Sequence, residues 1–211
     1  LGAAFINYGA ERHGFLPFKE IAPQYYPEKN NRKARLSVSD CLKKDQEILV
    51  QVEKDERGNK GAALTTNISL AGRYLVLMPN NPKAAGISRR LEGKEREKLK
   101  ERIASLNVPE SMGLIVRTAG EGKELEDLKW DLEYLQRVWE GINEANTLKN
   151  APILIFKESD IIIRALRDYL KEDIEEIWVD TEEAFEEASE FVERVMPDQA
   201  KILNKYENTL P

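Results

Sequence analysis

The stretch MGLIVRTAGEG, residues 112–122, decides how the rest of this sequence is interpreted. Its apolar run 114–116 is typical of a buried strand, which delivers Arg117 and Thr118 into a glycine-rich turn. Arginine offers a planar fork of donors that matches phosphate oxygens, and turn amides can form a nest for an anion. The stretch therefore predicts a phosphate site just after the strand; the alternative is a plain loop with Arg117 on the surface.

Composition narrows the class of protein. Hydrophobic residues make up 41% of the 211 residues, which indicates a folded globular chain of one large or two small domains. The single cysteine, Cys41, excludes an internal disulfide framework and favours a reducing, cytoplasmic location. No apolar run reaches the roughly 18 residues of a membrane span, and no signal peptide is visible. Because the sequence starts with Leu1 inside a predicted strand, we expect it to be a piece of a longer protein.

The net charge of −6 hides an asymmetry between the two halves. Residues 1–120 contain 21 Lys and Arg against 14 Asp and Glu, whereas residues 121–211 contain 11 against 24. Such asymmetry suggests a part that binds a polyanion joined to a part that does not. A phosphate-rich partner such as RNA is therefore expected to bind the first half.

Periodicity predicts a β-rich start followed by mixed α/β structure. Residues 3–8 alternate in the strand manner, with Ala4, Ile6 and Tyr8 on one face and Phe5 on the other. Short strands at 15–17, 46–52 and 62–67, separated by charged turns, suggest a small antiparallel barrel. We further expect strands at 73–78, 112–117, 153–156 and 174–180, and helices at 94–106, 123–146, 160–170 and after Thr181.

Five segments carry a resemblance to a known family. They are AAFINYGAERHGFLP (3–17), ERGNKGAALTTNISLAGRYLVLMPNNP (56–82), GISRR (86–90), MGLIVRTAG (112–120) and IIIRALRDYL (161–170). Together they resemble the bacterial ribonuclease E/G family of endoribonucleases, over essentially the whole chain. The resemblance implies an α+β multidomain fold: a partial OB-fold β-barrel at 1–66 without its first strand or strands, a mixed α/β 5′-sensor domain at 67–161, and an incomplete RNase H-like α/β piece at 162–211.

The resemblance implies RNA contacts in the first of these parts. Phe5 and Phe15 match RNA-contacting aromatic residues, and Lys60 matches a lysine that meets a backbone phosphate. Single-stranded bases stack on aromatic rings for about 1–3 kcal/mol each. The alternatives are that both phenylalanines pack in the barrel interior and that Lys60 is a solvated turn residue. The alternation puts Phe5 and Ile6 on opposite faces, and the sequence leaves open which of them points outward.

The resemblance also implies a site for a 5′-monophosphate. Arg117 and Thr118 match the family's arginine and threonine that bind this group, while Gly72 and Val76 match positions that contribute through backbone and packing. A closed pocket would exclude a bulkier triphosphate by its size. The pair at 89–90, Arg-Arg, either extends a positive path toward the site or is a solvated loop.

The family's catalytic magnesium-binding aspartates and paired-cysteine zinc motif have no counterpart in this sequence. The resemblance thus implies that this chain has no catalytic residue and binds neither magnesium nor zinc. It also implies that the catalytic domain of the longer hydrolase uses magnesium. The expected partner is single-stranded RNA with a 5′-monophosphate, and neither DNA nor a membrane. Contacts between subunits are expected to involve parts of the protein outside this sequence.

Two other functions are compatible with the same residues. The first is a stand-alone, non-catalytic RNA-binding or regulatory protein that uses the same barrel and sensor. The second is a protein-interaction surface on the acidic second half, with Trp130 and Trp178 as its anchors.

Overall fold

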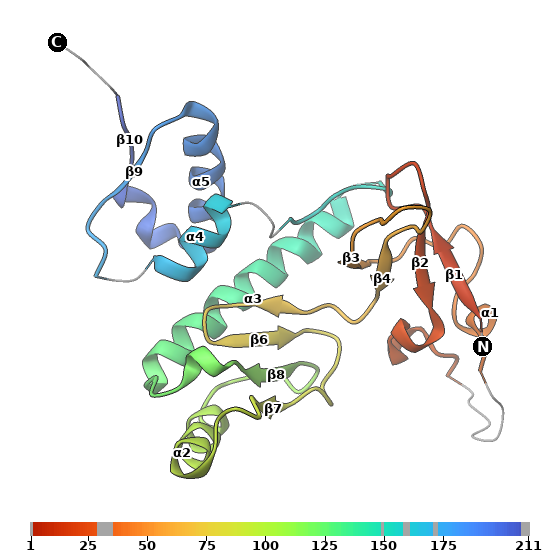
Figure 1. The fold of residues 1–211 in the computed structure, drawn as a ribbon, viewed down its shortest axis with the longest axis horizontal. Coiled ribbons are helices and arrows are strands. Elements are labelled where there is room, and N and C mark those ends of the chain that lie inside the picture. The colour runs from red at the N-terminus through yellow and green to blue at the C-terminus, as the bar shows by residue number, and fades with distance from the viewer. Residues whose placement is uncertain (1, 29–35, 149, 158–160, 171–172, 208–211) are drawn as a thin grey trace.

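A computed structural model describes residues 2–28, 36–148, 150–157, 161–170 and 173–207. The fold is mixed α+β, as expected, and contains three sheets among these residues. Figure 1 shows them in separate parts of the molecule: an N-terminal sheet, a central sheet crossed by a long helix, and a small C-terminal unit of helices with a two-stranded sheet.

The N-terminal sheet is open. It contains β1 (Ala3–Ile6), β2 (Gly14–Pro17), β3 (Gln51–Lys54) and β4 (Ala63–Thr65) in the order β1-β2-β4-β3. The expected small antiparallel barrel differs from this in two ways: the β2–β4 pair is parallel, and β1 and β3 lie at opposite edges without pairing. Because those edges do not meet, no barrel closes within the described residues. The short segments η1 (Phe18–Glu20), η2 (Pro23–Tyr25) and α1 (Val38–Cys41) complete this part.

The central sheet presents one face to a long helix. Its strands are β5 (Leu70–Ala71), β6 (Leu75–Met78), β8 (Gly113–Val116) and β7 (Gly86–Ile87), in the order β5-β6-β8-β7. The helix α3 (Leu125–Leu148) contacts β5 and β6, and α2 (Gly93–Ala104) contacts β7 and α3. Leucines repeat at 3/4 spacing along α3, so they form one apolar stripe that covers the inward-facing residues of β6 and β8. The strand at 112–117 and both helices were thus correctly predicted.

The C-terminal unit differs from the predictions in detail. It comprises α4 (Ile161–Tyr169), β9 (Ile177–Val179), α5 (Glu182–Val195), η4 (Pro197–Ile202) and β10 (Leu203–Lys205), with β9 and β10 parallel. Thr181 caps α5 as predicted, since its Oγ1 accepts a hydrogen bond from the Ala184 N–H at 3.3 Å. The predicted strand at 153–156 is wrong: this segment pairs with no described strand, and Leu154 is 70% exposed.

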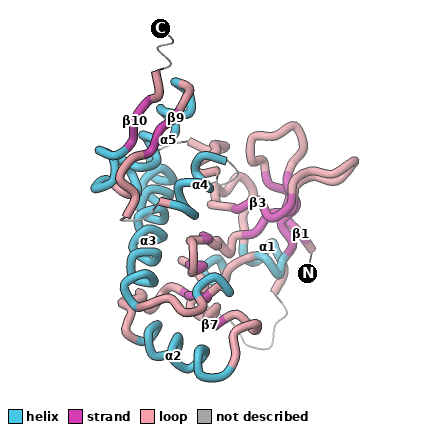
Figure 2. The backbone as a smooth tube through the Cα atoms, turned by 60° about the vertical axis from the view of Figure 1, so that its left-hand side comes forward, coloured by secondary structure: helices cyan, strands magenta, loops and turns pink. Residues whose placement is uncertain are grey.

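The apolar core divides into two clusters. Leu16, Ile21, Cys41, Ala62 and Leu64 form the N-terminal one. The second extends from Ile68 to Met196 and includes buried residues of the central sheet, α3, α4 and α5. Figure 2 shows α3 running between α2 and the C-terminal unit, consistent with the contacts of both α2 and α5 with α3. Among the described helices, none has the length and apolar character to cross a bilayer.

Candidate phosphate site and exposed aromatic pair

The end of β8 places Arg117 on the open face of the central sheet. Strand alternation puts Leu114 and Val116 against the core and Ile115 on the opposite face, which Arg117 then continues. Val76 lies on the same open face because it pairs directly with Ile115. The guanidinium of Arg117 donates from Nη1 to the Gly72 carbonyl oxygen at 2.5 Å, and the Arg117 N–H donates to the Tyr74 carbonyl at 2.8 Å. The fold therefore brings Gly72, Val76 and Arg117 together.

A buried carboxylate fixes the backbone on which Arg117 rests. Asp131, on α3, is fully buried and accepts hydrogen bonds from the N–H groups of Arg73, Tyr74 and Leu75 at 2.8–2.9 Å. Burial raises the pKa of Asp131, and the three backbone hydrogen bonds oppose this shift. The carboxylate therefore holds the turn between β5 and β6 and, with it, the Gly72 carbonyl that orients Arg117.

Thr118 lies beside a second hydroxyl. It begins the short 3-10 segment η3 (Thr118–Gly120), and its Oγ1 is 3.0 Å from the Oγ of Ser88, which follows β7. Thr118 is exposed and Ser88 is half-buried. Since Ser88 N–H also donates to the Val116 carbonyl at 2.8 Å, the two hydroxyls are held at the same edge of the sheet as Arg117.

Several charged side chains surround this edge. Arg89 and Arg90 directly follow Ser88 and are both exposed. The ammonium group of Lys123 lies 5.3 Å from the centre of the Tyr74 ring. The hydrogen bond from Arg167 lowers the pKa of Asp168, and the charges of Arg117 and Arg73 contribute further in the same direction. An ionised carboxylate therefore lies within electrostatic range of Arg117 and partly offsets its charge.

Phe5 and Phe15 form an exposed aromatic pair on the N-terminal sheet. They are directly paired in register across β1 and β2, with 71% and 43% of their surface exposed. Their ring centres are 6.1 Å apart in an edge-to-face arrangement. Ile6 points to the other side of β1 and packs on the N-terminal core. Of the two orientations that the sequence left open, the fold adopts the one with both phenylalanines in solvent.

Lys60 lies at the tip of the hairpin that joins β3 and β4. It is exposed and forms an antiparallel bridge with Arg57, with N···O distances of 2.9 and 3.1 Å. The Arg12 side chain donates to the Gly58 carbonyl, which ties the tip to the loop between β1 and β2. Lys60 therefore lies on a braced turn that joins two strands of the sheet that carries the aromatic pair.

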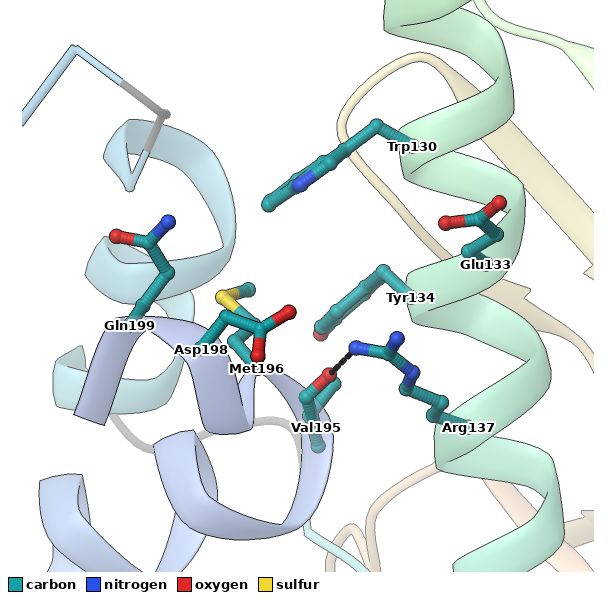
Figure 3. Close-up of a pocket in the computed structure, with 8 residues that line it drawn as sticks. All are labelled: Trp130, Glu133, Tyr134, Arg137, Val195, Met196, Asp198 and Gln199. Atoms are coloured by element: carbon teal, nitrogen blue, oxygen red, sulfur yellow. Dashed lines mark hydrogen bonds between the residues drawn. The ribbon is translucent and has the colours of Figure 1, made fainter.

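Two cavities are lined by other residues than these. One of about 430 Å³ lies between α3 and the C-terminal unit, with Trp130, Tyr134 and Arg137 in its lining (Figure 3). Trp130 is partly buried there, stacked on Tyr134 with ring centres 6.4 Å apart, which is contrary to its predicted role as an exposed anchor. Trp178, by contrast, is 56% exposed. Arg117 lines neither this cavity nor a second one of about 290 Å³.

The acidic, histidine and cysteine side chains bear on metal binding. The described residues contain no group of three or more His, Cys, Asp or Glu side chains arranged to hold a metal ion. The glutamates of α5, the most acidic stretch, lie on its exposed side. The described residues therefore do not fit a magnesium or zinc site.

Two residues at the candidate phosphate site, Asp131 and Ser88, were not predicted from the sequence. The sequence did contain a signal for the structural role of Asp131. This acidic residue is three positions after Leu128, on the core-facing stripe of α3, where an unpaired charge is costly. Ser88 lies in the GISRR segment, in which only the two arginines were considered as candidates for phosphate binding. Nothing in the sequence links position 88 to Thr118, because their contact depends on the pairing of β7 with β8.

Comparison with known proteins agrees with the resemblance. The model of the ribonuclease E/G family matches residues 69–211. The chain is 56% identical to ribonuclease E of Haemophilus influenzae over 211 residues and 54% identical to that of Escherichia coli over 212, covering 100% of this chain in both cases. It is 33% identical to ribonuclease G of Haemophilus influenzae over 99% of its length. The chain spans only 23%, 20% and 43% of these three relatives. With a family match over more than half of its residues, this chain belongs to the ribonuclease E/G family.

Proposed function

We propose that this chain is the RNA-recognition region of an endoribonuclease, binding single-stranded RNA and sensing a monophosphate at its 5′ end. The observation that carries the proposal is the position of Arg117. Arg117 is half-buried, its guanidinium is oriented by the Gly72 carbonyl on the open face of the sheet, and Thr118 follows it directly in the chain. A 5′-monophosphate presents terminal oxygens to such a fork of donors, which a 5′-hydroxyl lacks.

The proposed route of the RNA uses the N-terminal sheet as well. Two bases stack on the exposed rings of Phe5 and Phe15, which lose little conformational entropy on binding because they already pack against each other. Lys60 meets a phosphate of the RNA backbone. Such contacts tolerate any sequence, so selectivity in this proposal comes from the 5′ end.

The domain assignment belongs to the same proposal. Residues 1–66 form an incomplete OB-fold, 67–161 the 5′-sensor, and 162–211 part of an RNase H-like domain. We assign magnesium-dependent hydrolysis of RNA phosphodiester bonds to the region of the longer relatives that this chain does not match. In that protein the present chain positions the substrate.

The test compares two short single-stranded RNAs that differ only in a 5′-monophosphate or 5′-hydroxyl. Binding is measured by fluorescence anisotropy on the wild-type chain, on Arg117→Ala and on Arg117→Lys. We expect the wild type to prefer the monophosphate and Arg117→Ala to lose that preference, a change of about 10-fold or more for a hydrogen-bonded charge. Arg117→Lys keeps the charge but not the planar fork, so only part of the preference should remain.

Arg194→Ala is the charge-matched control, because Arg194 is exposed on α5 and far along the chain from the site. It should bind both RNAs as the wild type does. Equal binding of the two RNAs by the wild-type chain would refute the sensing part of the proposal. Loss of the preference in Arg194→Ala as well would show that overall charge, not the Arg117 site, is responsible.

A further inference from the structure

We infer that Ser88 is a positioning residue for phosphate binding: it donates its hydroxyl proton to Thr118 and so leaves the Thr118 proton free for the phosphate. This inference rests on the proposed 5′-monophosphate site. It starts from the 3.0 Å distance between Ser88 Oγ and Thr118 Oγ1, in which either oxygen can be the donor.

The chemistry of the ligand selects one of the two directions. A hydroxyl has a single proton to donate and two lone pairs that accept. The oxygens of an ionised phosphate only accept hydrogen bonds, so Thr118 must use its one proton to bind them. Thr118 then has only its lone pairs to offer Ser88, and Ser88 must be the donor between the two.

The backbone around Ser88 fits this direction. The Arg90 N–H donates to Ser88 Oγ at 3.4 Å, which occupies one of the lone pairs of that oxygen. The Ser88 proton then points away from Arg90, toward Thr118. The result is a chain of donors, from the Arg90 N–H through Ser88 and Thr118 to the phosphate, in which each hydrogen bond strengthens the next.

The segment that carries Ser88 is held on both sides. Its N–H donates to the Val116 carbonyl at 2.8 Å. From α2, the Arg96 guanidinium donates to the carbonyls of Ile87 and Ser88 at 3.2 Å and to that of Leu91 at 3.4 Å. Because these bonds do not involve the Ser88 side chain, replacing that side chain should leave the loop in place.

The experiment measures binding of the 5′-monophosphate and 5′-hydroxyl RNAs to Ser88→Ala, Thr118→Ala and the double variant. We expect Ser88→Ala to bind the monophosphate RNA about 3- to 10-fold more weakly, the effect of one hydrogen bond. Binding of the 5′-hydroxyl RNA and the melting temperature should not change. In the Thr118→Ala background, Ser88→Ala should have no further effect, because Ser88 acts through Thr118. Ser88→Thr, which retains a hydroxyl, should restore binding.

Ser111→Ala, at an exposed serine that precedes β8, is the matched control and should behave as the wild type. An equal loss from Ser88→Ala with and without Thr118 would overturn the inference, because Ser88 would then contact the phosphate itself. Equal weakening toward both RNAs would overturn it as well, by showing a general structural defect. If the wild-type chain does not distinguish the two RNAs, the proposed function fails and the inference falls with it. If the wild type prefers the monophosphate RNA and Ser88→Ala binds it equally well, the inference alone is refuted.

Discussion

Position 72 has no room for a side chain. A Cβ atom built on Gly72 would lie 2.6 Å from both carboxylate oxygens of Asp131. That carboxylate already holds three successive backbone N–H groups, so it cannot retreat without breaking them. The glycine thus allows a fully buried acid to approach the backbone, and the acid in turn fixes the carbonyl that orients Arg117.

Gly72→Ala should therefore lower the free energy of unfolding by about 1–3 kcal/mol, the usual cost of forcing extra atoms into a packed site. It should also weaken the preference for a 5′-monophosphate. Urea denaturation measures the first effect, and RNA binding the second. The control is Gly86→Ala on β7, where an added Cβ meets no atom within 4 Å, and we expect a change of under about 0.5 kcal/mol there. A stable Gly72→Ala variant would show that Asp131 moves freely.

At the scale of elements, β1 and β2 separate a packing face from a solvent face. Leu16, with 0% exposure, anchors the inner side, while Phe5 and Phe15 occupy the outer side. Exposed aromatic rings side by side make no contribution to the core, so their presence is consistent with ligand binding.

Phe5→Ala and Phe15→Ala should each weaken binding of single-stranded RNA by about 1–3 kcal/mol, the value of one stacked base. Their free energies of unfolding should stay close to that of the wild type, because neither ring belongs to the buried core. Anisotropy titrations with 5′-hydroxyl RNA isolate this effect from that of the 5′ end. Val52→Ala, at another exposed apolar side chain of the same sheet, serves as the control. Unchanged affinity in both phenylalanine variants would remove this face from the RNA path.

The helix α4 ends in an ion pair that makes its stability depend on pH. Arg167 Nε lies 2.8 Å from an Asp168 carboxylate oxygen and lowers the Asp168 pKa below the ordinary 3.8 of an unfolded chain. The folded state therefore holds its proton less tightly than the unfolded state does. The resulting stabilisation is complete above the unfolded pKa and is lost as the pH falls through the folded one.

Asp168→Asn should consequently be less stable than the wild type near neutral pH, and the difference should shrink below about pH 4. Because the Asp168 side chain is 41% exposed, we expect a difference of under about 1 kcal/mol. Urea denaturation of both proteins across this pH range measures it. Asp131 titrates in both proteins and its contribution cancels in the comparison. A constant difference down to about pH 3 would contradict the assignment of the lowered pKa.

For the molecule as a whole, Arg73 joins the central sheet to the C-terminal unit. Its guanidinium donates to the Arg167 carbonyl at 3.0 and 3.2 Å and also to the Leu170 carbonyl, so it caps the last turn of α4. The same group lies 5.0 Å from the centre of the Trp130 ring. Its own N–H donates to Asp131, so a single residue connects the candidate phosphate site, α3 and α4.

Arg73→Ala should loosen α4 without affecting the N-terminal sheet. Hydrogen bonds to a charged group are worth about 1.5–3 kcal/mol, so we expect amide exchange in α4 to accelerate about 10-fold or more. Hydrogen exchange read by mass spectrometry resolves the two regions. Arg57→Ala, on the N-terminal hairpin, is the control and should leave α4 protected. Equal acceleration in both regions would mean that Arg73 supports the entire fold and not this junction.

Most helices and strands of this protein, and its candidate phosphate-binding residues, could be predicted from the amino-acid sequence. Apolar periodicity located α2, α3, α5 and the strand before Arg117, because a local pattern selects a helix or a strand wherever one face is buried. Gly72, Val76, Arg117 and Thr118 could also be named in advance, by resemblance.

How these elements and residues contact one another could not be predicted from the sequence. The sheet order places Ser88 beside Thr118, the docking of α3 places Asp131 beneath Gly72, and the packing of β1 turns Phe5 outward. It also leaves 153–156 without a strand, although its apolar run suited one. The physical reason is the same in each case. Hydrogen bonds and packing between residues far apart in the chain depend on which elements become neighbours, and a local sequence pattern does not specify those neighbours.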